Sequence, residues 1–150
     1  MVRGKWILAA VLGSMMGMGA SQVFAQADVI EKRQKLMKGQ SANVKAIKAA
    51  VEAKDFATVE TKAKDLMGSA DQIPSLFPKG STKGKTKATA AIWEKSDEFE
   101  KHAKNLNKAS GELAAAAKNK DEAKVETHVK AVSGACGSCH KAFRADKYSE

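Results

Sequence analysis

Two cysteines and a histidine stand close together near the C-terminal end of this sequence, as Cys136-Gly137-Ser138-Cys139-His140, and the chain has no other cysteine. This spacing is the attachment signature of a c-type haem: two thiols bond to the two vinyl groups of one porphyrin, and the adjacent imidazole reaches the iron. On a helix, with about 100° between successive residues, Cys136, Cys139 and His140 fall within an arc of about 100°. The motif therefore predicts one covalently attached haem c on a single helix face, with His140 as an iron ligand.

The same cysteines would also suit a redox dithiol or half of a zinc site. Zinc needs a fourth ligand, and the chain offers only His102 or His128, without a second CxxC or an HxxxH pair. Both histidines lie at the margins of apolar helix faces, which is typical of surface histidines. A thioredoxin-like dithiol belongs to a βαβ setting, and the sequence shows no strand pattern. Haem is therefore the favoured interpretation.

The N-terminal segment resembles a secretory signal more than a part of the fold. Two cations precede an apolar run, Trp6 to Leu12, and a stretch of small residues follows as far as Ala25. This pattern predicts a signal peptide over residues 1–25, cleaved after Ala25 or alternatively after Ala27. A retained anchor is less favoured because a membrane span needs about 20 apolar residues. We therefore expect a periplasmic protein without stable membrane insertion, in the oxidising compartment where haem c attachment takes place.

The remaining residues, 26–150, suit one compact domain. Aromatic residues make up only 5% of the sequence and prolines number two, both in the expected loop at 74–87. Apolar residues recur at helical spacing in four segments, and Asp55 is expected to cap the second. The expected helices cover residues 28–53, 56–73 and 92–117, and the fourth runs from Asn119 or Asp121 to Phe143. The prediction is an all-α fold, an antiparallel up-down-up-down four-helix bundle with covalently bound haem.

The sequence resembles the class II c-type cytochromes, whose best-known members are called cytochrome c′. The resemblance covers residues 28–146, and its most specific parts are residues 32–37, residues 76–78, Ile92-Trp93, and the stretch from Cys136 to Arg144. In this family the haem motif lies near the C-terminus, as it does here. Relatives often have a proline shortly before the tryptophan, whereas this chain has Ala90-Ala91-Ile92-Trp93. The start of the third helix is therefore the least certain boundary.

The resemblance also implies roles for individual residues. Residues 32–37 look most like the low-spin members, so Met37 is expected as the sixth iron ligand opposite His140. Depth along the helices alone leaves Met67 open as well. Trp93 is expected at the haem edge, with ordinary packing as the alternative, and Phe143 on the haem face.

Two arginines complete the expected cofactor site. Arg144 looks like the family's arginine near the proximal histidine, with a solvated helix end as the alternative. Arg33 lies one turn from Met37 on the predicted first helix. It is expected to pair with a haem propionate, because a guanidinium matches a carboxylate bidentately. An ordinary surface arginine is the alternative.

Charge restricts the partners. The formal net charge is +9, and removal of Arg3 and Lys5 with the signal leaves +7. The lysines are not interleaved with aromatic residues, and export removes nucleic acid as an ordinary partner. We expect periplasmic redox partners, most plausibly acidic ones, because a basic surface steers them. The sequence leaves monomer and homodimer open.

Two functions follow from these residues. The first is a soluble one-electron carrier with His/Met iron ligation. The alternative is a five-coordinate cytochrome c′ that binds nitric oxide or carbon monoxide. The occupancy of the sixth position by Met37 separates them. No acid–base or nucleophile constellation lies beside the motif, so we do not expect an enzyme.

Overall fold

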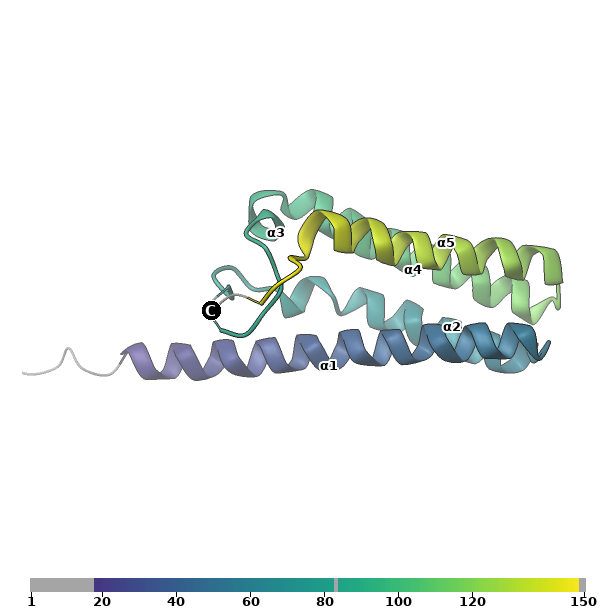
Figure 1. The fold of residues 1–150 in the computed structure, drawn as a ribbon, viewed down its shortest axis with the longest axis horizontal. Helices are drawn as coiled ribbons and strands as arrows, with labels where there is room; N and C mark the ends of the chain where they lie inside the picture. Colours follow the sequence, from purple (N-terminus) through teal and green to yellow (C-terminus); the bar gives the residue numbers. More distant parts are fainter. Residues whose placement is uncertain (1–17, 83, 149–150) are drawn as a thin grey trace, which may run out of the picture.

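The computed structural model describes residues 18–82 and 84–148, with side chains from residue 27 onward. Four long helices dominate the described residues (Figure 1), and a short 3-10 helix, η1, and a short helix, α3, lie between them. Their bounds are α1 Met18–Glu52, α2 Phe56–Asp71, η1 Pro74–Leu76, α3 Ala91–Glu94, α4 Ser96–Lys118 and α5 Glu122–Phe143.

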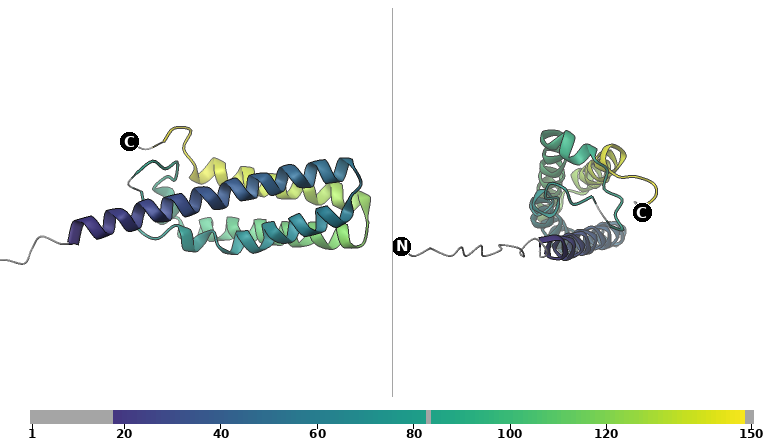
Figure 2. Two further views of the ribbon diagram at one scale, coloured as in Figure 1. Left: turned by 90° about the horizontal axis from the view of Figure 1, so that it is seen from below. Right: turned by 90° about the vertical axis from the view of Figure 1, so that its left-hand side faces the viewer.

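The long helices form an antiparallel bundle in which each packs on its neighbour in the chain. α1 lies against α2, α2 against α4 and α4 against α5, whereas α1 and α5 make much less contact with each other. The end-on view in Figure 2 shows these helices around a common centre, and the C-terminal residues lie at the same end of the bundle as the segment between α2 and α3. The predicted all-α bundle is confirmed.

The two short turns of the bundle are built alike. The side chain of Asp55 accepts a hydrogen bond from the Thr58 amide, and that of Asp121 accepts one from the Lys124 amide, each at 3.1 Å. The N-cap at Asp55 was expected from the sequence, and Asp121 was one of the two starts expected for the last helix. The preceding residues, Lys54 and Lys120, have φ values of 54° and 53° and end the previous helices in the left-handed conformation that glycine usually supplies. The hydroxyl of Thr58 is the main reason that the pKa of Asp55 is lowered.

Two boundaries differ from the predictions. Helix α1 begins at Met18, ahead of the expected start at residue 28, so the predicted cleavage site after Ala25 falls within it. The first 17 residues of the predicted signal lie outside the described residues, and cleavage remains a prediction. The expected third helix is interrupted at Lys95, whose φ of −124° and ψ of 50° are not helical, so it forms the separate helices α3 and α4.

Apolar side chains from α2, α4 and α5 fill most of the core. Val59, Leu66, Leu113 and Val125 have no exposed surface. Three alanines of the run at 114–117, Ala114, Ala116 and Ala117, are also buried, which agrees with the close helix packing expected there. Apolar side chains do not fill the space between α1 and α5 in this way.

The segment between α2 and α3 is held to α1 by Arg33, whose side chain is only 4% exposed. Its guanidinium donates hydrogen bonds to the Leu76 carbonyl at 3.0 Å, the Ser81 hydroxyl at 2.7 Å and the Thr86 hydroxyl at 3.3 Å. It also stacks on the Phe77 ring at 3.9 Å from the centroid. Burial lowers the pKa of Arg33 to about 10, which leaves it charged at neutral pH. The surface alternative for Arg33 is therefore wrong.

Arg33 should make a large contribution to stability. Arg33→Ala removes a buried charged donor from at least three loop acceptors, and we expect the free energy of unfolding to fall by about 3 kcal/mol. The matched control is Lys32→Ala, because Lys32 makes only an exposed pair with Asp28 and its loss should cost less than about 0.5 kcal/mol. Urea unfolding of the haem-loaded protein measures both. Equal losses for the two variants would contradict this account of Arg33.

Candidate haem site

A cavity of about 650 Å³ lies between α1 and α5, where the two helices contact each other least. One wall is formed by α5, the facing wall by α1, and the floor mainly by α4, with the α2–α3 segment closing one end. The principal lining residues are Met37, Gln40 and Val44 on α1, Phe99, His102, Ala103 and Leu106 on α4, and Ser133, Cys136, Cys139, His140 and Phe143 on α5.

The α5 wall presents all three residues of the predicted haem motif. Cys136, Cys139 and His140 line the cavity, and the two cysteines are unpaired and partly buried. Burial raises the pKa of both thiols, that of Cys139 to about 11 with a smaller effect of Cys136. Within residues 27–82 and 84–148, no three His, Cys, Asp or Glu side chains converge as a metal site would require. The zinc alternative therefore has no ligand set in the described part of the chain.

His140 lies in the last turn of α5 with its ring partly open to solvent. Partial removal from water lowers its pKa, and the positive charge of Arg144 lowers it further. The imidazole is therefore neutral at pH 7, and a neutral ring has a nitrogen lone pair available for iron. Arg144 also lines the cavity, at the residue where α5 ends, and it is exposed. Both expected features of Arg144, a helix end and proximity to His140, are present.

Phe143, the aromatic residue of α5, lines the cavity and also belongs to the hydrophobic core. It is 3% exposed and packs edge-on against Phe99, with ring centroids 5.3 Å apart. His102 packs against the same ring at 5.6 Å. Phe143 thus lies on the expected haem face.

Met37 lines the cavity on the opposite wall, half-buried on α1. The other methionine whose side chain is described, Met67, points elsewhere: its sulfur lies beside Gly111 of α4, 3.3 Å from where a Cβ on that glycine would be. Met67 does not line the cavity. Of these two thioether candidates, only Met37 faces the α5 wall.

Trp93 is not among the residues that line the cavity, and its expected contact with the haem edge stays a prediction. Its indole N–H is shared between the carbonyls of Phe77 and Pro78, at 3.0 Å from each. A buried or half-buried indole usually satisfies its donor in this way. Trp93 therefore anchors α3 to the turn after η1, as in the packing alternative.

The sequence analysis treated His102 as a surface histidine and did not single out Gln40. His102 lines the cavity, and its Nδ1 lies 3.3 Å from the Ser138 hydroxyl inside the CxxCH motif. The Ser138 hydroxyl also lies 3.1 Å from the Ala135 carbonyl, to which it can donate. Gln40 is buried and donates to Ser69 at 3.0 Å. Both lie one helical turn from a recognised apolar residue, Phe99 or Met37, and that spacing was the available signal.

The cavity fits a haem. Its floor is apolar, its two long walls carry a thioether on one side and two thiols with an imidazole on the other, and its charged lining residues are all basic: Arg33, Lys38, Lys48, Lys87 and Arg144. A haem is an apolar macrocycle with two carboxylates, so this combination is complementary to it. A helical bundle whose cavity is lined in this way belongs to the class of all-α proteins that bind haem c covalently.

Comparisons with known proteins agree with this class. The family model for cytochrome C′ matches residues 28–144. The cytochrome c′ of Rhodospirillum rubrum is 30% identical over 95% of this chain and 99% of its own length. The cytochrome c-556 of Agrobacterium fabrum is 34% identical over 95% and 97%, respectively. Among solved structures, the cytochrome c′ of Thermochromatium tepidum has a TM-score of 0.75 and 28% identity, covering 81% of this chain and 97% of that one.

The chain therefore belongs to the cytochrome c′ family. Proteins of this family carry one covalently attached haem c, as the motif predicts. No helix in the described part of the chain is long and apolar enough to cross a membrane.

The attachment residues can be tested directly. We expect haem to remain on the wild-type chain after acid extraction and denaturation, adding one haem mass, because thioether bonds to Cys136 and Cys139 are covalent. Cys136→Ala/Cys139→Ala should lose all haem on extraction, and Cys136→Ala alone should keep one bond. Mass spectrometry of the denatured chains measures this. A colourless wild-type protein with free thiols or bound zinc would contradict the assignment.

Proposed function

We propose that this protein is a periplasmic haem c protein whose iron, held by His140, binds nitric oxide or carbon monoxide. The sequence analysis placed electron transfer with His/Met ligation first, but the family match favours the alternative. The observation that carries the proposal is the likeness to cytochromes c′ over the whole bundle. One of them, 27% identical, has a dimer whose dissociation is controlled by ligand. The behaviour of that relative supports ligand binding by this protein, together with an equilibrium between monomer and dimer.

The residues of the site have different roles. Cys136 and Cys139 would hold the haem covalently on α5, beside His140. His140, kept neutral by its surroundings, supplies a nitrogen donor. Phe143, backed by Phe99, holds the end of α5 against α4. When bound, the haem supplies an iron that can take up a diatomic ligand or exchange one electron.

The main role that we assign to Arg33 is structural, ahead of a role in binding the cofactor. Its guanidinium already donates to the Leu76, Ser81 and Thr86 oxygens, and so it keeps the segment that closes the cavity in place. Pairing with a haem propionate remains the prediction made above. Arg144, exposed beside His140, is free to move toward the cofactor or solvent.

A second candidate function is electron transfer with Met37 as sixth ligand. It is favoured by one specific observation, the position of Met37 on the wall that faces the haem motif, while Met67 lies against Gly111. Two relatives at 34% and 32% identity are cytochromes c-556. A thioether ligand and burial would both raise the reduction potential.

The spectrum of the purified protein distinguishes the two functions. For the proposed function we expect high-spin haem at neutral pH, ready binding of carbon monoxide after reduction, and little change in Met37→Ala, because the sixth position is open. Met67→Leu is the matched control on α2 and should change nothing. A low-spin wild-type spectrum with little carbon monoxide binding, converted to high spin by Met37→Ala alone, would replace the proposal with the His/Met electron carrier.

A further inference from the structure

Tyr148 is the one large apolar side chain that is mostly exposed among residues 27–82 and 84–148, at 51%, whereas the others are buried or half-buried. It lies at the mouth of the cavity and contributes to its lining. The sequence contains no other tyrosine. An aromatic side chain left in water at the opening of a cofactor site is a typical anchor for a partner protein.

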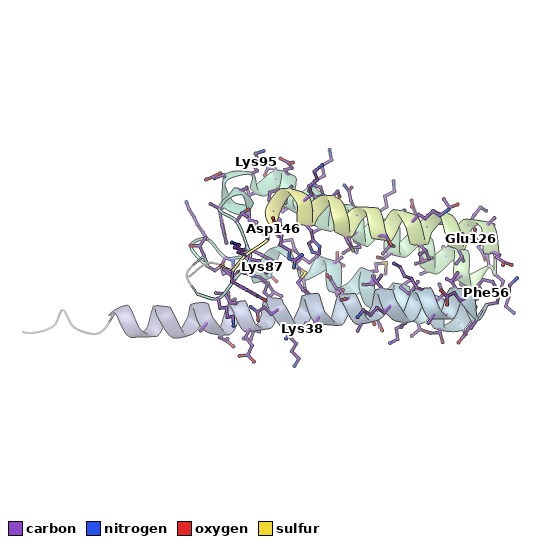
Figure 3. All side chains as sticks on the ribbon, viewed as in Figure 1. Lys38, Phe56, Lys87, Lys95, Glu126 and Asp146 are labelled. Carbon is purple, nitrogen blue, oxygen red and sulfur yellow. The ribbon has the colours of Figure 1, made fainter. Side chains whose placement is uncertain are left out.

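Two lysines hold Tyr148 in place from the segment that precedes α3. The ammonium groups of Lys85 and Lys87 lie 5.6 Å and 5.0 Å from the centre of its ring. Lys87 also donates to the Asp146 carbonyl at 2.6 Å, and Figure 3 shows these two residues together between α1 and the end of α5. An antiparallel bridge between Ala88 and Arg144 ties the same two segments together. The tyrosine is therefore positioned by the fold.

The lysines at the cavity mouth are set apart by their position, because they gather at a cavity whose charged lining residues are all basic. Eight lysines form ion pairs with carboxylates, namely Lys32, Lys54, Lys62, Lys64, Lys95, Lys104, Lys108 and Lys124. Three lining lysines, Lys38, Lys48 and Lys87, and the neighbouring Lys85 pair with no carboxylate among the described residues. Asp146 is the acidic residue next to this surface, and it uses its backbone carbonyl there. We call Tyr148 with these four lysines the basic rim.

We propose that the basic rim is the docking surface for an acidic one-electron transfer protein that reduces the haem iron. The inference rests on the proposed haem function, since carbon monoxide binds ferrous iron and the iron must first be reduced. Two propionates of a haem would neutralise at most two of the four lysines. The remaining charge faces outward, where it raises the rate of encounter with a negatively charged partner. Tyr148 supplies the apolar contact at the centre.

An anionic membrane is a poorer fit for the basic rim. Binding to a membrane surface combines basic residues with several apolar side chains that enter the headgroup region. The rim offers one aromatic ring, and the described residues expose no second large apolar side chain nearby. The observations therefore favour a protein partner.

A plant-type ferredoxin serves as the probe, because its cluster is a one-electron donor with a potential of about −400 mV. The reduced cluster loses one electron and the ferric haem iron gains it, with no proton or group transferred. We expect the second-order rate to fall steeply with added salt. Lys85→Gln/Lys87→Gln should lower the low-salt rate by roughly threefold or more. The control Lys118→Gln/Lys130→Gln removes the same charge from exposed residues that do not line the cavity and should leave the rate unchanged.

Two further measurements locate the contact. Tyr148→Ala should lower the rate that persists at high salt, while Tyr148→Phe should not. Carbodiimide joins lysines to partner carboxylates, and its cross-links to ferredoxin should fall on Lys38, Lys48, Lys85 or Lys87. Equal effects of the two lysine pairs, a rate independent of salt, or cross-links centred on Lys118 would overturn the proposal.

Two controls separate this proposal from others. Tight binding of the protein to equimolar phosphatidylglycerol–phosphatidylcholine vesicles, lost in Lys85→Gln/Lys87→Gln while the ferredoxin rate is kept, would overturn it in favour of a membrane. The absorption spectrum of each variant checks that the haem site is intact. Because the spectrum tests iron ligation and the cross-links test docking, failure of the proposed function and failure of this inference are distinguishable.

Discussion

The structure depends on keeping α1 and α5 apart around an apolar space of about 650 Å³. This space opens to solvent at its mouth, so without a cofactor its apolar floor is exposed to water, and each Å² of apolar surface left uncovered forgoes about 25 cal/mol of stabilisation. The bundle therefore needs its cofactor for packing as well as for chemistry. The core is continuous through α2, α4 and the inner face of α5, and α1 and α5 also supply the two long walls of the cavity.

Arg33 connects this space to the rest of the chain. Its hydrogen bonds fasten the segment between α2 and α3 to α1, and the bridge between Ala88 and Arg144 fastens the same segment to the end of α5. The segment between α2 and α3 thus joins α1 to the end of α5, and these two helices form the long walls of the cavity. His140 and Met37 keep their relative positions because of this connection, although neither residue takes part in it.

The outer helix faces and the cavity also differ in the charged side chains that they carry. On the outer helix faces, lysines neutralise nearby carboxylates, and such exposed pairs contribute at most about 1 kcal/mol each. Around the cavity the charged side chains are all cationic. A haem with two carboxylates, and a partner with a negative surface, both suit this arrangement. The asymmetry is a property of the folded molecule, because lysines are spread along the whole sequence.

The amino-acid pattern by itself determined the helical class, the haem motif and the N-cap at Asp55, since these depend on residues close in sequence. It also identified Met37, Phe143 and Arg144 as residues of the cavity. Only the tertiary structure buried Arg33 and placed Met37, rather than Met67, on the cavity wall. It also paired the Trp93 indole with the turn after η1, while the haem contacts of Met37 and Trp93 stay predictions. It also brought His102 and Tyr148 to the site. Those outcomes depend on which helices meet across the bundle, and helical periodicity carries no information about partners distant in the chain.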